Sequence, residues 1–153
     1  MEQVIHYEVK EGDKVWLALF AYVQPSFEAK NYFREHLRSF ASIFSASWVV
    51  SGDFNNFASS DESCGGSGDC FGHMLQFRDR WSECNLLDAN FSSSKFTWVC
   101  KLHGRVIFQE HLNRVLINIA AAQCFPKLYV FKLPRLFSDH HPILFNINAS
   151  EIP

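Results

Sequence analysis

The 153-residue sequence lacks three features: a long apolar run, a paired-cysteine motif and an excess of charge of one sign. No run approaches the length of a membrane-spanning helix, and Glu2, Glu8 and Glu11 interrupt the N-terminal apolar positions, which argues against a signal peptide. The five cysteines are odd in number and form no Cys-x-x-Cys pair, which favours reduced thiols over a disulfide framework. These absences predict a soluble, intracellular chain, nuclear or cytoplasmic, with no membrane partner.

Composition sets the next limits. The net charge of −2 gives no global electrostatic case for nucleic-acid binding. It does not exclude a metal-dependent nuclease, in which acidic site residues offset basic residues elsewhere. Hydrophobic residues make up 48% of the chain and 16 residues are phenylalanines, which indicates a packed core rather than disorder. The length predicts a single domain over residues 1–150.

Strands and helices follow one another in mixed order, which predicts an α/β or α+β fold. Ser26 is suited to cap a helix over residues 27–44, and a second helical stripe covers residues 74–84. A tight turn at Gly12 joins the first two strands, and residues 56–70 are expected to form a loop. The expected strands cover residues 4–9, 15–23, 48–52, 86–88, 95–99, 106–108, 112–117, 128–131 and 143–147, with one or two helical turns at 118–124.

The stretch Trp48–Asn55 is an apolar strand that ends in polar residues. Because side chains alternate along a strand, Asp53 and Asn55 are expected to project to one side and Phe54 to the other. A carboxylate beside a carboxamide at a strand end is one way to build a polar site. The alternative is a strand followed by an Asx-type turn, since both residue types favour turns.

Polar groups also stand at two other strand ends: Tyr22, and Asp139 with His140. Metal-assisted phosphodiester hydrolysis needs such a set. A hard divalent cation takes one or two carboxylates, waters and the substrate phosphate, while an attacking water must be oriented and deprotonated. An aspartate can activate the water, an asparagine can hold it, and a histidine can donate to a phosphoryl oxygen.

Four motifs follow one another along the chain: Gly52-Asp53-Phe54-Asn55, Phe96-Thr97-Trp98, Leu112-Asn113-Arg114 and Ser138-Asp139-His140-His141-Pro142-Ile143. In this order they resemble the endonuclease/exonuclease/phosphatase superfamily, over residues 4–147. Among its members the chain is most similar to the endonuclease domain of LINE-type (non-LTR) retrotransposons of plants. The resemblance implies a four-layer sandwich, two mixed sheets face to face with helices outside.

The resemblance also implies roles for single residues. Tyr22 matches a tyrosine that contacts the scissile phosphate, and Asp53 an aspartate that positions or deprotonates the attacking water, with Asn55 beside it. Asp139 matches a carboxylate near the metal, and His140 a histidine that contacts the phosphate in the transition state. Phe96 and Trp98 fall in a motif that is mainly structural. The implied cofactor is Mg²⁺ or Mn²⁺ and the implied partner is DNA.

Two departures from the family pattern affect these expectations. The aspartate that orients the catalytic histidine is here Asn113, and an arginine two positions earlier is His111. Family members also begin with a segment carrying an asparagine and a metal-binding glutamate, and this sequence starts after both. Glu2 and Glu8 do not lie in that glutamate motif. We therefore expect an N-terminally truncated sandwich lacking its first strands, with an open sheet edge suited to self-association.

Two functions remain open from the sequence. One is a magnesium-dependent DNA endonuclease that nicks a target for retrotransposition, in a copy with impaired or absent activity. The other is a non-catalytic module that keeps the nuclease fold and binds nucleic acid or protein. Lys101, His103 and Arg105 could touch a DNA backbone or form a solvated loop. Zinc is not favoured, because neither Cys64 with Cys70 nor the adjacent pair His140-His141 has a usual zinc spacing.

Overall fold

The computed structural model describes residues 4–65, 71–91 and 94–148. The helices are α1 (Phe27–Ile43), α2 (Phe71–Glu83) and α3 (Ile119–Cys124), with a 3₁₀ turn at Ser60–Glu62. The strands are β1 (Val4–Glu11), β2 (Lys14–Tyr22), β3 (Trp48–Asp53), β4 (Ser63–Cys64), β5 (Leu86–Asp88), β6 (Trp98–Leu102), β7 (Arg105–Glu110), β8 (Asn113–Asn118), β9 (Tyr129–Lys132) and β10 (Ile143–Asn146). No helix over these residues is long and apolar enough to cross a membrane.

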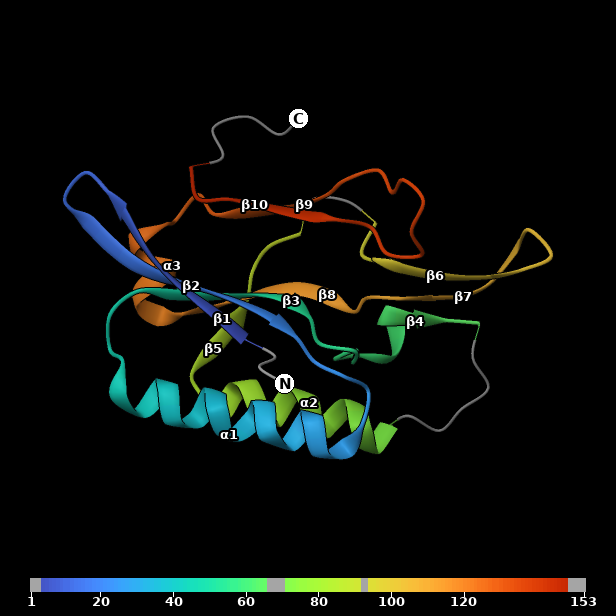
Figure 1. Ribbon diagram of the computed structural model, residues 1–153, viewed down its shortest axis with the longest axis horizontal. Helices are drawn as coiled ribbons and strands as arrows, with labels where there is room; N and C mark the ends of the chain where they lie inside the picture. Colours follow the sequence, from blue (N-terminus) through green and yellow to red (C-terminus); the bar gives the residue numbers. More distant parts are fainter. Residues whose placement is uncertain (1–3, 66–70, 92–93, 149–153) are drawn as a thin grey trace.

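The strands form two facing layers, with α1 and α2 on the outside of one of them, so the expected fold class is confirmed. The first sheet has the order β1-β2-β3-β8-β5, with α1 and α2 packed on one face (Figure 1). The β9–β10 pair lies over the opposite face, and β6, β7 and β4 continue beside it. A single bridge between Trp98 and His140 links these two parts. No helix of the described chain covers the outer face of β9 and β10 (Figure 1).

Two apolar cores separate these layers. The core under the helices joins Phe33 and Leu37 of α1 to Val50 of β3 and Phe77 of α2. The core between the sheets contains Trp16, Val49, Val115, Ala121 and Val130. Because β3 alternates its side chains between the two cores, its first four residues are buried on both faces of the sheet.

Local sequence signals explain most element boundaries. The Ser26 hydroxyl accepts from the Ala29 amide at 3.2 Å, which confirms the predicted start of α1. Gly12, with φ 59°, closes the two-residue turn between Glu11 and Lys14. The strand predicted at 95–99 instead covers Trp98–Leu102, because its limits follow its pairing with β7. The 56–70 loop contains the 3₁₀ turn and β4, and residues 66–70 lie outside the described part.

Candidate active site

The candidate site begins as a row of three side chains across neighbouring strands. Tyr22 at the end of β2 pairs with Asp53 at the end of β3, and Asp53 pairs with Asn113 at the start of β8. Directly paired residues place their side chains on the same face of a sheet. The strand order therefore brings together three residues that lie up to 91 positions apart in the sequence, at one end of the central strands of the first sheet.

Asn55 joins this row through a turn rather than through strand alternation. β3 ends at Asp53, and Asn55 has a φ of 47°. Its backbone amide donates to Asp53 Oδ1 at 2.9 Å, which is an Asx turn, and its side-chain amide donates to Asp53 Oδ2 at 3.3 Å and to the Val23 carbonyl at 2.8 Å. The Asp53 and Asn55 side chains do lie together, but strand alternation was the wrong reason to expect it. Asn55 lies beyond the end of β3, and its left-handed backbone conformation breaks the alternation. The turn and the polar pair are both present.

Asp139 and His140 reach the site from the segment between β9 and β10. Main-chain bonds hold this segment against β6: the Val99 amide donates to the Asp139 carbonyl at 3.0 Å, and the His141 amide donates to the Thr97 carbonyl at 2.7 Å. The Trp98 indole donates to Asp139 Oδ2 at 3.0 Å. This hydrogen bond is the largest cause of the lowered pKa of Asp139, which keeps that carboxyl ionised.

Thr97 is a supporting residue that sequence reasoning did not single out. It is fully buried, and its hydroxyl accepts from the amides of Leu112 and Asn113, at 3.0 and 2.9 Å. The motif Phe96-Thr97-Trp98 thus fixes the start of β8 through Thr97 and the Asp139 carboxylate through Trp98. The sequence signal that could have identified Thr97 is its place in this motif, next to Trp98.

His140 lies between Asn113 and Asp53. Its Nδ1 is 3.1 Å from Asn113 Oδ1, and its Nε2 is 3.9 Å from Asp53 Oδ2. Because an amide oxygen only accepts, Nδ1 carries a hydrogen in this arrangement, and Nε2 faces the site. An amide in this place orients the ring without supplying the negative charge that would stabilise an imidazolium.

The Asp53 carboxyl is largely shielded from water, and burial is the main reason that its pKa is raised. The Asn55 amide and His140 act in the opposite direction, whereas the Asp139 charge raises the pKa further. A raised pKa makes the carboxylate a stronger base and so better suited to accept a proton from water. Tyr22, which is 55% exposed, stands beside it at the mouth of an open groove.

The oxygen donors fit a hard divalent cation. Asp53 and Asp139 supply two carboxylates and Asn55 an amide oxygen, whose own NH₂ group is already directed to Val23 and Asp53. Magnesium is commonly held by one or two carboxylates, with waters and a phosphate completing its shell. Asp139 is the more accessible of the two carboxylates.

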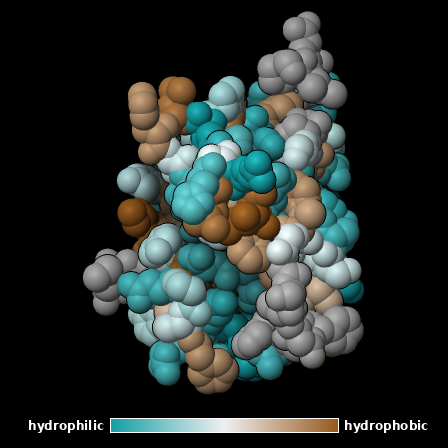
Figure 2. Space-filling view, turned by 90° about the vertical axis from the view of Figure 1, so that its right-hand side faces the viewer, coloured by the Kyte–Doolittle hydropathy of each residue, from teal (hydrophilic) through white to brown (hydrophobic). Residues whose placement is uncertain are grey.

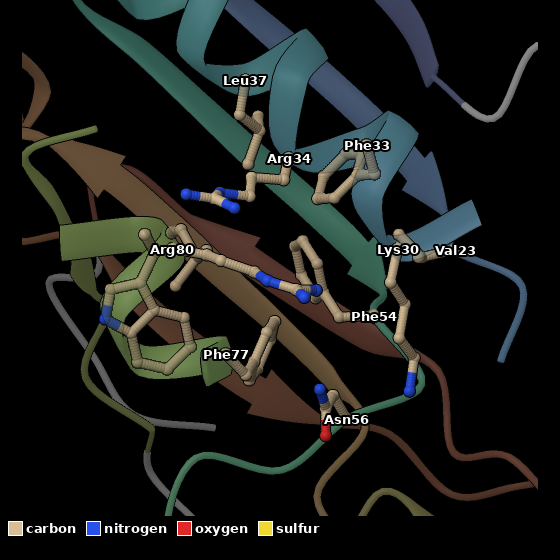
Figure 3. Close-up of a pocket in the computed structure, with 11 residues that line it drawn as sticks. Val23, Lys30, Phe33, Arg34, Leu37, Phe54, Asn56, Phe77 and Arg80 are labelled. Carbon is tan, nitrogen blue, oxygen red and sulfur yellow. The ribbon is translucent and has the colours of Figure 1, made fainter. Parts of the chain in front are cut away.

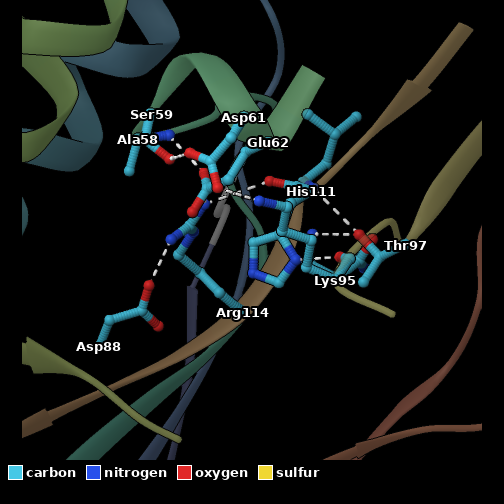
Figure 4. Close-up of polar contacts among 11 residues, drawn as sticks. Ala58, Ser59, Asp61, Glu62, Asp88, Lys95, Thr97, His111 and Arg114 are labelled. Atoms are coloured by element: carbon cyan, nitrogen blue, oxygen red, sulfur yellow. Dashed lines mark hydrogen bonds and ion pairs between the residues drawn. The ribbon is translucent and has the colours of Figure 1, made fainter. Parts of the chain in front are cut away.

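A second group of candidate ligands lies away from this site. In the described part of the chain, Glu62, Asp88 and His111 bring three ligand atoms within 4.8 Å of one another. The fully buried Arg114 guanidinium stands among them, 2.6 Å from Glu62 and bonded to Asp88 (Figure 4). Arg114 thus supplies the positive charge that a metal would bring, and the group is a buried ion-pair network.

The structure also places the residues that were considered for zinc binding and for contact with a DNA backbone. The His140 and His141 rings bond to different partners, Asn113 and the Leu133 carbonyl, which gives no support for a zinc pair. Cys64 is exposed, whereas Cys70 lies outside the described residues. Lys101 lies in β6, Arg105 begins β7 and His103 is in the hairpin turn between them, and all three are exposed.

A small pocket between α1 and α2 lies on the helix side of the first sheet (Figure 3). Arg34 and Arg80 line it together with the rings of Phe54 and Phe77. Its volume of about 20 Å³ is room for roughly one water molecule. The pocket is therefore a packing defect behind the site, too small for a nucleotide.

No protein-family model and no curated protein sequence matches the chain. Solved structures do match it. The endonuclease domain of TRAS1, a telomere-specific non-LTR retrotransposon, has a TM-score of 0.72 at 17% identity, over 97% of this chain and 65% of that one. The 3′ phosphatase NExo from Neisseria, bound to a product DNA hairpin, has a TM-score of 0.67 at 15% identity, over 86% and 61%.

A beta toxin mutant from Staphylococcus aureus with bound magnesium ions has a TM-score of 0.53 at 12% identity, over 94% of this chain and 53% of that one. The chain thus spans between 53% and 65% of the length of these three structures. At such identities the likeness concerns the fold alone. The chain has the fold of the endonuclease/exonuclease/phosphatase proteins.

Proposed function

We propose that the chain carries a metal-dependent phosphodiesterase site of the DNA endonuclease type, with impaired turnover. The observation that carries the proposal is the convergence of Asp53, Asn113 and His140 at distances of 3.1 and 3.9 Å, with Tyr22 in the same row. The motif order that resembles LINE-type endonucleases and the likeness to the TRAS1 endonuclease domain support DNA as the substrate.

The residues divide the work of hydrolysis among them. The Asp53 carboxylate accepts a proton as the water oxygen attacks phosphorus, and Asn55 holds Asp53 in place. Tyr22 and His140 face the phosphoryl oxygens. Asp139, with Asp53, would hold Mg²⁺ or Mn²⁺, which neutralises charge on the phosphoryl and leaving oxygens when bound. The bond from phosphorus to the leaving oxygen then breaks.

Impaired turnover follows from two features of this set. His140 can donate from Nε2 only after it takes up a second proton, and the neutral Asn113 gives that imidazolium no stabilising charge. The ion would also rest on two carboxylates, one of which must act as the base.

Nicking of supercoiled plasmid DNA in Mg²⁺ or Mn²⁺ tests the proposal. We expect slow conversion to the open circle that requires the metal and disappears in Asp53→Ala and in Asp139→Ala. Glu8→Ala, which removes an exposed carboxylate on β1, is the matched control and should nick as the wild type does. Metal-independent nicking, or nicking that survives both aspartate substitutions, contradicts the proposal.

A binding module is the second candidate, favoured by an open groove between the sheets. Ile5, Phe20 and Leu144 are 58%, 41% and 49% exposed along a groove of about 710 Å³. In the described residues β10 pairs with β9 alone, so its other edge is open to an added strand, such as that of a second copy. Concentration-dependent dimers that Leu144→Lys abolishes, in a protein that binds DNA without cutting it, would favour this function.

A further inference from the structure

The loop that carries Asp139 also carries a fully exposed aromatic ring. Phe137 is 109% exposed and Leu136 is 78% exposed. Phe137 has a φ of 56°, a left-handed conformation that is costly for a bulky side chain. On the face toward which the β6–β7 hairpin points, hydrophobic side chains lie among polar ones (Figure 2). An exposed ring on a strained backbone does not stabilise the folded chain.

The base of this loop is firmly held. The Leu133 amide donates to the Pro142 carbonyl at 2.8 Å and closes the loop. At its tip the Arg135 guanidinium donates to the Ser138 carbonyl at 3.3 Å, and the Ser138 hydroxyl accepts from the His140 amide at 3.1 Å. These bonds fix the place of the Phe137 backbone with respect to Asp139 and His140, while the ring itself stays in water.

Phe137 borders a groove that leads to Asp139. The groove measures about 760 Å³, large enough for a nucleotide, and lies between β6 and the loop. Its wall on β6 includes Lys101 and its wall on the loop includes Arg135, so two cations line it. Its one carboxylate, Asp139, bonds to the Trp98 indole at the end nearest the candidate site. The groove thus offers positive charge for a phosphate and one aromatic face for a base.

We propose that Phe137 is the stacking platform for the base of a nucleotide adjacent to the scissile phosphate, with Lys101 and Arg135 holding that nucleotide's own phosphate. The proposal rests on the proposed function for its substrate class. Aromatic side chains stack on any base, so this contact gives affinity and register along the strand without a strong sequence preference. It makes Phe137 a positioning residue: the ring holds the strand so that the next phosphate lies at Asp53 and Asp139.

Affinity for a fluorescein-labelled single-stranded oligonucleotide of about 10 nucleotides, measured by anisotropy in EDTA, tests the contact without cleavage. We expect Phe137→Ala to weaken binding by roughly 5- to 150-fold, the range for loss of one base–aromatic stack, and Phe137→Trp to restore it. Phe137→Gly removes the ring and also relieves the positive φ. It should raise stability yet bind as weakly as Phe137→Ala. Tyr32→Ala, which removes a 60% exposed ring on α1, is the matched control.

A series of oligonucleotides, each with one abasic site, locates the stacked base. In the wild type one abasic position should cost as much affinity as Phe137→Ala, and in Phe137→Ala that position should cost nothing further. Equal affinity of the wild type and Phe137→Ala, or no oligonucleotide binding by the wild type, overturns the inference. Phe137-dependent binding in a protein that never nicks DNA would refute the proposed function and leave the stacking contact standing.

Discussion

At the scale of single residues, the contact between His140 and Asn113 decides how well the site can work. Both side chains keep the geometry expected of a catalytic pair, with Nδ1 and Oδ1 3.1 Å apart, and only the charge of the acceptor is missing. Asn113→Asp replaces the side-chain nitrogen by an oxygen and so restores the missing charge at this position. The chain therefore allows the electrostatic contribution of this position to be measured on an unchanged backbone.

Asn113→Asp should raise the rate of plasmid nicking. A carboxylate would stabilise the protonated His140 ring and so favour donation from Nε2 to a phosphoryl oxygen. In the serine-protease triad the analogous exchange is worth roughly 10⁴ in rate. We expect a gain of at least about tenfold here, because the metal carries part of the charge stabilisation. The measurement is the single-turnover nicking rate in Mg²⁺.

The double substitution Asn113→Asp with His140→Ala serves as its control, since the new carboxylate has nothing to act through once the ring is removed. Asn113→Ala should nick no faster than the wild type. A gain that persists without His140 would assign the effect to metal binding by the new carboxylate and contradict the electrostatic account.

At the scale of elements, sequence patterns predicted most helices and strands because each signal is local. Ser26 caps α1, Gly12 turns the first hairpin, and the apolar run of β3 becomes a strand buried on both faces. The site was predicted less completely. Asn55 enters it through a left-handed turn, and Thr97 acts through bonds to residues fifteen and sixteen positions away. Such long-range contacts depend on strand order, which periodicity does not encode.

Gly52 shows how the packing of two strands constrains the site. A Cβ placed on Gly52 would lie 1.9 Å from the Ala21 carbonyl oxygen, so β2 and β3 approach more closely than any other residue allows. We expect Gly52→Ala to lower the free energy of unfolding by at least about 2 kcal/mol, because the strands must separate. Urea unfolding followed by circular dichroism measures it.

Gly12→Ala is the matched control for this change. Gly12 has a positive φ but no atom within 4 Å of an added Cβ, so only backbone strain applies, at about 1 kcal/mol. The substitution at Gly52 should also abolish nicking, since Asp53 follows it directly, whereas that at Gly12 should not. Equal destabilisation by the two substitutions would show that β2 and β3 adjust to a side chain between them.

At the scale of the whole molecule, one buried ion network ties separate elements together. Arg114 of β8 bonds to Glu62 of the 3₁₀ turn, to Asp88 of β5 and to the His111 carbonyl, and its guanidinium lies over the Trp81 ring of α2 at 5.0 Å (Figure 4). This residue directly follows Asn113. The charge network under the sheet and the candidate site above it therefore share one strand, so the stability of the network bears on the geometry of the site.

His111 makes that stability depend on pH. Burial, and then the Arg114 charge, lower the pKa of His111 from 6.5 to about 4. Between these values the unfolded chain binds a proton that the folded chain does not. The free energy of unfolding should therefore fall as the pH drops from 6.5 to 4, by up to about 3 kcal/mol. The raised pKa values of Asp53 and Asp88 act oppositely, since those carboxyls take up protons on folding.

His111→Asn isolates the contribution of the histidine from that of the carboxyls. Urea unfolding at pH 7, 5.5 and 4 should show a steeper loss of stability in the wild type than in His111→Asn, while His103→Asn, at an exposed hairpin turn, should follow the wild type. Because the carboxyls are the same in all three proteins, the difference in slope belongs to His111. Parallel pH profiles would mean that His111 is protonated in the folded chain. The effect of Glu62, which raises the pKa of His111, would then outweigh that of Arg114, which lowers it.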